Sequence, residues 1–528
     1  QVSSSSPQKQ ILSPPLLLKS KSSLLLLLLL LLLLLDSNIW KFNQSSAFSL
    51  NPPPYPFPTW PIFGHLPLLG TLPHHSFYNL SKTYGDIMEL KLGSIHALVI
   101  SSPEMAKEVL KTHDLVFASR PKSIISQLSS YGGHSVGWAP YGDHWRHMRK
   151  VSVLELFTTK SFNASKNIRH KELSLLVQRI FQDCKEGKPM DMQTTLCNAS
   201  MNLMTHLLFG KSFLTTKSSN DECAQFKNLI VKEVALAGAF NISDFVPFLK
   251  PFDIQGLQRQ MNLTRLKVDN FLNKIIQDRL NEKKPNESKD FLDVLLSLPG
   301  KNGSSHRLED NTVKAVINES LMAGTDASAT TIEWALVELL KHPKVMKKVQ
   351  DELDGVVGDG RFVNENDIPQ LKYLQAIVKE TFRLHPPAPL LVPHESIESC
   401  EINGYHVPAK TRIFVNIWAI HRSLCAYENP LDFNPERFVG SEVDLKGSDF
   451  QLLPFGSGRR MCPALSLGLI TVQMELAMLL HSFMWKLPIG EKPEDIDMGE
   501  VFGISTPKAI PLKVIAIAQF PSDLYVIP

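Results

Sequence analysis

The chain has 528 residues, of which 43% are hydrophobic, so it is long and apolar enough to bury a large core. Its 55 basic and 52 acidic side chains give a formal net charge of only +3, which argues against a nucleic-acid-binding protein. The six cysteines are scattered, with no CxxC pair and no zinc-site spacing, which indicates reduced thiols in a reducing compartment.

The first 50 residues contain an unbroken leucine run, Leu24–Leu35, preceded by Lys19 and Lys21 and followed by Asp36. The run is shorter than the roughly 20 apolar residues that span a bilayer, so it fits either a cleaved secretory signal or a retained signal-anchor. No small-x-small cleavage site follows Asp36, which favours the anchor. The positive-inside rule places the two lysines in the cytosol, which conflicts with an anchor that holds a cytosolic domain.

Residues 51–61 are rich in proline, which fixes φ and favours an extended, stiff segment. After this segment no further linker is long enough to divide the chain, because the polar loops Pro285–Asp290 and Gly300–His306 have helical patterns on both sides. We therefore expect an N-terminal tail and membrane anchor over 1–50, a proline-rich hinge over 51–61 and one large domain over 62–528.

The large domain is predicted to be mainly α-helical with small β elements. Alternation of apolar and polar residues in Met88–Gly93 and His96–Ile100 predicts a hairpin. Ser102, followed by proline, is a typical N-cap of a helix. A long helical pattern without proline runs over Val313–Leu340 and is ended by Pro343. There is no βαβ alternation and no internal repeat.

The segment Phe455–Ala464 (FGSGRRMCPA) carries the most specific chemical signal. Its glycines permit a tight turn with positive φ, and Pro463 suits the first turn of a helix predicted over Ala464–Leu480. Cys462 would then lie at a helix N-terminus close to Arg460, a position that favours the metal-binding thiolate. A single thiolate on haem iron promotes cleavage of the O–O bond. An isolated cysteine in a glycine-rich loop would instead be an ordinary buried residue.

The full pattern Phe-x-x-Gly-x-Arg-x-Cys, which ends at Cys462, resembles the haem-binding signature of cytochromes P450. Ala464 stands where the family usually has glycine. The resemblance implies a cytochrome P450 fold with small β-sheets, haem b as the cofactor and Cys462 as the iron ligand. The proline hinge, Phe117–Pro121 and Pro386–Pro389 are similar to plant microsomal enzymes of the A-type clan.

The same resemblance assigns further residues to the haem. Trp145 and Arg149, one helical turn apart, would reach a propionate, because arginine suits planar carboxylates; a Trp–Arg stack on a surface helix is the alternative. Arg460 would also contact a propionate, and His394 is a further candidate, although a lone histidine is more often a core or surface residue. The expected cofactor-binding residues are Trp145, Arg149, His394, Phe455, Arg460 and Cys462.

Glu380 and Arg383 resemble the family's Glu-x-x-Arg element, and Arg437 lies in its PERF partner motif. Three residues apart on a helix, the first two share one face. The resemblance implies that the three form a buried salt-bridge triad near the haem loop. Alone, Glu-x-x-Arg would be a common solvated pair.

The long helix contains Ala323-Gly324-Thr325-Asp326-Ala327-Ser328, which resembles the family's oxygen-activation motif. The small side chains of Ala323 and Gly324 would let the helix pass close to the haem and leave a groove for O₂; a helix–helix contact is the other interpretation. The expected catalytic residues are Ala323, Gly324, Asp326, Ala327 and Ser328.

Ala327 departs from the family pattern, which has a proton-relay threonine at this position. Protonation during O₂ activation needs an ordered donor, and alanine has no hydroxyl. A substrate hydroxyl or a water fills the gap, or Ser328 or Thr331 partly substitutes, or the enzyme is a haem-thiolate isomerase or dehydratase that does not activate O₂.

The resemblance implies a monooxygenase on the cytosolic face of the endoplasmic reticulum, held by its N-terminal anchor and supplied with electrons by NADPH–cytochrome P450 reductase. Docking would use a basic face that includes Lys150 and Arg459. A lipophilic substrate is expected, a terpenoid first and a phenylpropanoid or alkaloid second, because two of the implied pocket segments are mostly apolar. The implied pocket segments are Ile124–Val136, Asn318–Thr325, Ala388–Val392 and Val501–Ser505.

Overall fold

The computed structural model describes residues 51–213, 221–281, 290–299 and 308–526. The chain divides into two compact units, Gln1–Pro52 and Pro53–Pro528. The leucine run Leu24–Leu35 lies outside the described residues, as do residues 300–306 and most of residues 285–290. The following description therefore concerns the unit that begins at Pro53.

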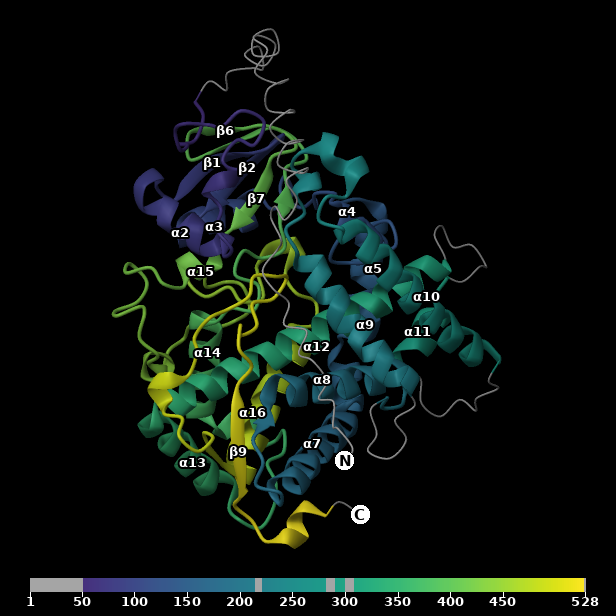
Figure 1. Cartoon of the computed structure of the whole chain (residues 1–528), viewed down its shortest axis with the longest axis vertical. Coiled ribbons are helices and arrows are strands. Elements are labelled where there is room, and N and C mark those ends of the chain that lie inside the picture. Colours follow the sequence, from purple (N-terminus) through teal and green to yellow (C-terminus); the bar gives the residue numbers. More distant parts are fainter. Residues whose placement is uncertain (1–50, 214–220, 282–289, 300–307, 527–528) are drawn as a thin grey trace, which may run out of the picture. The chain divides into compact units, whose positions relative to one another are not determined.

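The helices of this unit account for most of its structure, which confirms the expected mainly α fold with small sheets (Figure 1). They are α2 (Pro73–Tyr84), α3 (Pro103–Lys107), α4 (Ile124–Ser129), α5 (Asp143–Val151), α6 (Thr159–Ala164), α7 (Lys166–Cys184), α8 (Met192–Phe209), α9 (Asp221–Gly238), α10 (Leu257–Asn281), α11 (Phe291–Ser297), α12 (Asp310–Lys341), α13 (Pro343–Val357), α14 (Lys372–Leu384), α15 (Ile417–Ile420) and α16 (Leu465–Ser482). The predicted cap of α3 is present, because the Ser102 hydroxyl accepts the N–H of Met105 at 3.4 Å.

Three small sheets accompany the helices. The largest has the strand order β1-β2-β7-β4 and contains the predicted hairpin, which is confirmed. Gly93 in its turn has a φ of +61°, and a Cβ there would lie 2.2 Å from the carbonyl oxygen of Phe245, so only glycine fits. The strands are β1 (Ile87–Leu92), β2 (Ile95–Ile100), β3 (Met190–Asp191), β4 (His394–Glu395), β5 (Cys400–Ile402), β6 (Tyr405–Val407), β7 (Arg412–Val415), β8 (Phe483–Lys486) and β9 (Lys513–Ala518).

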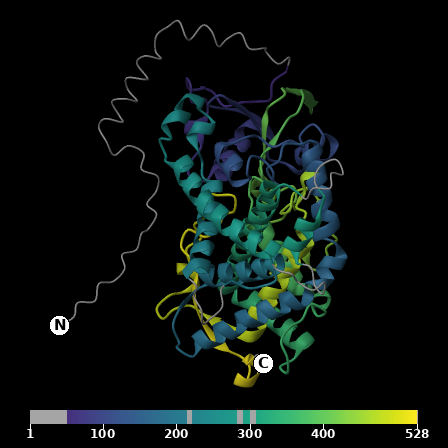
Figure 2. The same cartoon turned by 90° about the vertical axis from the view of Figure 1, so that its right-hand side faces the viewer.

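Helix α12 is the long helix that the sequence predicts, and it runs through the middle of this unit (Figures 1 and 2). It packs against α8, α9, α14 and α16, so it is buried on nearly all sides. One of its polar groups is paired across the core, because the Trp334 indole N–H donates to the carbonyl of Thr506 at 3.0 Å. Pro343 begins the next helix, as the pattern predicts.

Helix α16 is long and apolar enough to cross a membrane by length and composition, and it is the one such helix among the described residues. Two-thirds of it is buried within the protein, where it packs against α7, α12, α13 and α14. We therefore assign α16 to the core of the unit.

The proline-rich segment is hydrogen-bonded to the globular unit. The carbonyl of Pro54 accepts the N–H of Glu89 in β1 at 2.8 Å, and the carbonyl of Pro56 accepts a hydrogen bond from His65 Nε2 at 2.8 Å. At least the part from Pro54 to Pro56 is thus packed on the body.

Candidate functional site

The cysteine loop is a tight turn that leads into α16. A 3₁₀ turn over Gly458–Arg460 is followed by Cys462, whose N–H donates to the carbonyl of Phe455 at 3.0 Å. Gly458 has a φ of +68°, and a Cβ there would lie 2.0 Å from the carbonyl oxygen of Leu110. Any other residue at this position would therefore displace the loop that carries the thiol.

Helix α16 begins at Leu465, with Ala464 as its N-cap, so the prediction that Pro463 lies in its first turn is wrong. The backbone of Ala464 has a φ of −97° and a ψ of 19°, which is outside the helical range. The sulfur of Cys462 is instead approached by the single N–H of Ala464. This one hydrogen bond, and not a helix N-terminus, is the backbone contribution to a thiolate.

Arg460 leaves the loop and enters the interior of the protein. Its guanidinium donates to the carbonyls of Ala118 at 2.6 Å, Val136 at 3.1 Å and Ala139 at 2.6 Å. It also lies over the Trp145 ring of α5, 4.3 Å from the centroid. Phe455, at the start of the same loop, lies edge-on to Phe382 of α14. Trp145 is buried, so the alternative interpretation of Trp145 and Arg149, a stack on a surface helix, does not hold.

Arg120 and His394 lie beside Arg460. Arg120 Nη1 donates to the carbonyls of Val392 at 2.6 Å and Pro393 at 3.0 Å. His394 in β4 is buried, and its ring Nδ1 lies 2.8 Å from the carbonyl oxygen of Phe117. Burial, and then the charge of Arg120, hold the pKa of His394 well below its usual value, so the ring is neutral and Nδ1–H donates to that oxygen.

Among the described residues, no carboxylate forms an ion pair with Arg120, Arg149 or Arg460. Burial, and then repulsion from Arg120, lower the pKa of Arg460 to about 8, while burial lowers that of Arg120 to about 9. Burial also lowers the pKa of Arg149, which the nearby Cys462 opposes. The acidic group that partly offsets the charge of Arg120 and Arg460 is Glu319 of α12. A dianionic group would fit this cluster of cations.

Sequence reasoning missed Arg120 and Glu319 as site residues. The Glu319 carboxylate accepts the N–H groups of Val136 at 2.9 Å and Gly137 at 2.7 Å, so it ties α12 to the segment after α4. Arg120 lies in the segment Phe117–Pro121, whose family resemblance was the available signal. No local pattern indicated Glu319.

The three charged residues of the predicted triad lie together. Glu380 and Arg383 of α14 are fully buried and form a bidentate pair, with Nε–Oε2 at 2.7 Å and Nη2–Oε1 at 2.8 Å. Arg437, in the 3₁₀ turn Pro435–Phe438, adds an Nε–Oε1 contact at 3.1 Å. The triad therefore joins α14 to the segment before the cysteine loop, and the solvated-pair alternative does not hold.

The motif in α12 is divided between two neighbours. Ala323 is exposed although Met322 and Thr325 beside it are buried, which places an open space next to Ala323. A Cβ on Gly324 would lie 2.5 Å from the Met204 sulfur of α8. Gly324 thus lies at a close helix–helix contact, and its expected place beside an oxygen groove stays a prediction.

Asp326, Ala327 and Ser328 follow the open position. The Asp326 carboxylate accepts a hydrogen bond from the Ser505 hydroxyl, and its burial raises its pKa. The Thr331 hydroxyl donates to the Ala327 carbonyl at 2.8 Å, within the helix. Ser328 is buried. Thr331 is therefore already engaged and is a poor substitute for the absent relay hydroxyl.

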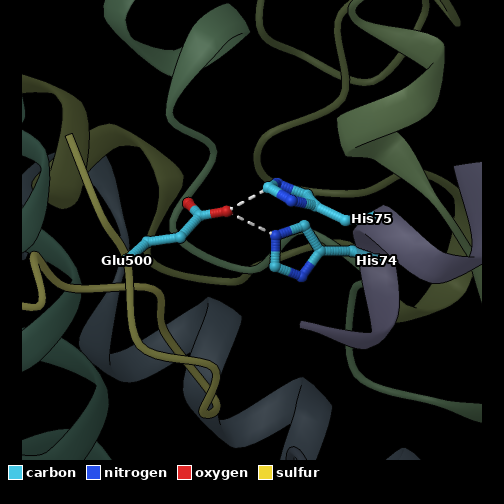
Figure 3. A group of neighbouring side chains, drawn as sticks. All are labelled: His74, His75 and Glu500. Carbon is cyan, nitrogen blue, oxygen red and sulfur yellow. Dashed lines mark hydrogen bonds and ion pairs between the residues drawn. The ribbon is translucent and has the colours of Figure 1, made fainter. Parts of the chain in front are cut away.

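A second cluster has the composition of a metal site. Glu500 Oε1 lies 2.7 Å from His74 Nε2 and 2.8 Å from His75 Nε2, both at the start of α2 (Figure 3). A metal-binding histidine donates its other ring N–H to an acceptor, but His74 Nδ1 is buried without one. The cluster is better explained as a hydrogen-bonded clamp between α2 and the C-terminal segment.

Comparison with known proteins decides the family. The Cytochrome P450 family model matches residues 53–513. The chain belongs to the cytochrome P450 family. As a cytochrome P450 it is a monooxygenase whose cofactor is haem b.

The P450 is similar to plant enzymes of the A-type clan. It is 45% identical to Cytochrome P450 CYP736A12 of Panax ginseng, over 85% of this chain and 90% of that protein. It is 42% identical to a flavonoid 3'-monooxygenase of Arabidopsis thaliana, over 88% of this chain and 90% of that protein. A zebrafish cytochrome P450, solved with progesterone, matches with a TM-score of 0.73 and 27% identity, over 85% of this chain and all of that chain.

The residues of this P450 fit a haem. Helices α12 and α16 pack against each other. Ala323 of α12 is exposed, and residues 461–470, at and before the start of α16, are at least partly exposed. A haem would cover these positions. The paired propionates of haem would supply the negative charge that Arg120, Arg149 and Arg460 lack. The sulfur of Cys462 would bind the haem iron.

Burial raises the pKa of the Cys462 thiol, although the N–H of Ala464 and the charge of Arg149 oppose the shift. The protein alone therefore does not favour the thiolate, contrary to the expectation from the loop sequence. A coordinating metal deprotonates a thiol outright. The chain thus holds the sulfur in place, and a bound haem iron would stabilise its thiolate form.

Proposed function

We propose that the enzyme hydroxylates a lipophilic plant specialised metabolite, with O₂ as the oxidant and with electrons from NADPH. The observation that carries the proposal is the buried arginine cluster around the Cys462 loop, which has the charge that a haem requires and lies close to Glu319 of α12. Bound haem supplies the redox chemistry, and the protein holds the sulfur, screens it from water and orients the substrate.

The expected substrate is a terpenoid, because two of the four implied pocket segments are mostly apolar, and apolar pockets bind apolar ligands. These apolar residues are Ala388, Leu390, Leu391, Val392, Val501, Phe502 and Ile504. Flavonoids, which are phenylpropanoid-derived, form the second candidate class, since a relative over 88% of this chain is a flavonoid 3'-monooxygenase. Turnover of matched terpenoid and flavonoid panels, with reductase and NADPH, separates the two classes.

We propose that a substrate hydroxyl or a bound water delivers the proton at Ala327. The Thr331 hydroxyl donates to the Ala327 carbonyl, which favours this over relay by Thr331. The competing isomerase or dehydratase would form product without NADPH. Product formation that needs no NADPH would therefore overturn the monooxygenase proposal.

We propose that residues 1–50 anchor the enzyme in the endoplasmic reticulum membrane, that residues 51–61 are its hinge and that residues 62–528 form a cytosolic haem domain. NADPH–cytochrome P450 reductase would dock through Lys150 and Arg459. Both side chains are exposed, and Arg459 pairs with Asp114 at 3.1 Å. Charge reversal of both cations should slow reduction by the reductase, with a salt dependence that differs from that of the unchanged enzyme.

A further inference from the structure

Two polar side chains meet in the interior between α9 and α12. Glu233 of α9 is fully buried, and Asn318 of α12 is 1% exposed. The Asn318 Nδ2 group donates to Glu233 Oε1 at 2.9 Å and reaches the Ser129 carbonyl of α4 at 3.4 Å. Helices α4, α9 and α12 pack against one another here. Three elements therefore converge on this pair.

The contacts of Asn318 fix which end of its amide is free. All three groups near its nitrogen, the Glu233 carboxylate, the Ser129 carbonyl and the Met322 sulfur, are acceptors, so the nitrogen must face them. The oxygen Asn318 Oδ1 is then buried without a partner among the residues that the structure describes, and so is Glu233 Oε2. Native proteins rarely leave such groups unpaired, because a buried acceptor without a donor has lost its hydrogen bonds to water.

The pair lies along α12 from the open position at Ala323. Asn318 lies five positions before Ala323, which places it about 7.5 Å away along the helix axis and roughly 140° around it. Asn318 also begins the segment Asn318–Thr325, which we expect to line the substrate pocket. Met322, whose sulfur lies 3.6 Å from Asn318 Nδ2, is the residue next to Ala323. A substrate that extends from Ala323 around the helix past Met322 would therefore reach Asn318.

We infer that Glu233 and Asn318 form a recognition site for a hydroxyl group on an otherwise lipophilic substrate. This inference rests on the proposed monooxygenase function and narrows its substrate class. Both free atoms are acceptors, so the ligand group must be a hydrogen-bond donor. A pure hydrocarbon or a methyl ether would bury the two acceptors unpaired, whereas an alcohol or phenol satisfies them.

The surrounding charges favour a neutral donor over a cation. Burial raises the pKa of Glu233 to about 7, and Arg265 lies close enough to offset part of its charge. Arg265 stacks on the Tyr131 ring, 4.6 Å from the centroid, and Lys314 lies over the same ring. The charge of Arg265 therefore opposes the binding of an ammonium group. A hydroxyl also suits either protonation state of Glu233, since it both donates and accepts.

The test uses probes that bind through the haem, so the natural substrate need not be known. Three series of N-alkylimidazoles of increasing chain length carry a terminal hydroxyl, methyl ether or ammonium group. The affinity of each probe is measured from the shift of the haem absorption band in the holoenzyme. At one chain length the alcohol should bind about tenfold or more tightly than the ether, because it pairs a buried acceptor. Equal affinity at every length, or tighter binding of the ammonium probe, would overturn the inference.

Three variants locate the effect. Asn318→Leu and Glu233→Gln should each reduce the preference for the alcohol about threefold or more. Glu333→Gln is the matched control, because Glu333 is also buried on α12, has a pKa raised by burial to about 7 and accepts the N–H of Leu512 instead. An equal reduction of the alcohol preference in all three variants would overturn the inference. Where a variant loses its haem, the affinities of the alcohol, ether and ammonium probes for the unchanged enzyme decide the inference. Loss of NADPH-dependent turnover with the preference intact would refute the proposed function alone.

Discussion

Neutralising Glu380 removes the one acidic member of the buried triad. Its carboxylate accepts two hydrogen bonds from Arg383, one from Arg437 at 3.1 Å and the N–H of Asn434 at 2.7 Å. In Glu380→Gln one of the two oxygens becomes an N–H₂ group that faces arginine donors. The charge of Arg383, which is fully buried, is then left without a counter-charge.

The expected cost is large because both partners are inaccessible to water. Breaking one partner of a buried ion pair destabilises a protein by about 3–5 kcal/mol. Unfolding entropy of about 2.1 cal/mol/K per residue, over the unit Pro53–Pro528, amounts to roughly 1 kcal/mol per degree. Glu380→Gln should therefore lower the Tm by about 3–5 °C.

The assay is thermal unfolding followed by far-UV circular dichroism at two scan rates, since a large chain often unfolds irreversibly. The control is Lys347→Gln, which breaks the exposed pair of Lys347 and Asp351. Exposed pairs contribute about 0–1 kcal/mol, so this Tm should move by no more than about 1 °C. Equal shifts for the two variants would refute the reasoning about the buried triad.

Three further predictions concern single buried or pocket residues. Burial raises the pKa of Glu475 from 4.5 to about 8, and neither carboxylate oxygen has a partner in the described part of the chain. The stability of the protein should therefore fall as the pH rises from 4.5 to 8. Glu475→Gln should flatten the dependence of Tm on pH, and an unchanged slope would contradict the prediction. Ala327→Thr should change the product formed per NADPH by less than about twofold, because a substrate hydroxyl or water already acts as the proton donor. A rise in product per NADPH of the size typical of acid catalysis would contradict that proposal. Arg460→Leu should reduce the haem bound per protein after purification, while Arg146→Leu, at an exposed position on α5, should not; equal haem contents would argue against a propionate role for Arg460.

The local elements could be predicted because their signals lie within a few residues. Alternation over Ile87–Ile100 is sufficient for a hairpin, and the uninterrupted apolar pattern of α12 is sufficient for a long buried helix. The cysteine loop was also evident, since its glycines, arginine and cysteine are contiguous. The start of α16 was missed by one residue, because Ala464 is the N-cap and Pro463 precedes it instead of entering the helix.

The errors and omissions depend on partners far away in the sequence. The bare face of Gly324 meets Met204, which lies on α8, and no pattern in α12 shows which neighbour a small residue will face. Glu319 binds backbone N–H groups of Val136 and Gly137, and Asn318 meets Glu233. Such pairings arise from tertiary packing, so they became visible only in the folded structure.

The absorption spectrum of the reduced, CO-bound protein tests the central claim most directly, because a thiolate ligand shifts the haem band strongly to longer wavelength. The unchanged enzyme and Cys425→Ser, which alters an exposed cysteine, should show this thiolate band. Cys462→Ser should lose it together with NADPH-dependent turnover. A thiolate band that persists in Cys462→Ser would contradict the assignment of Cys462 as the iron ligand.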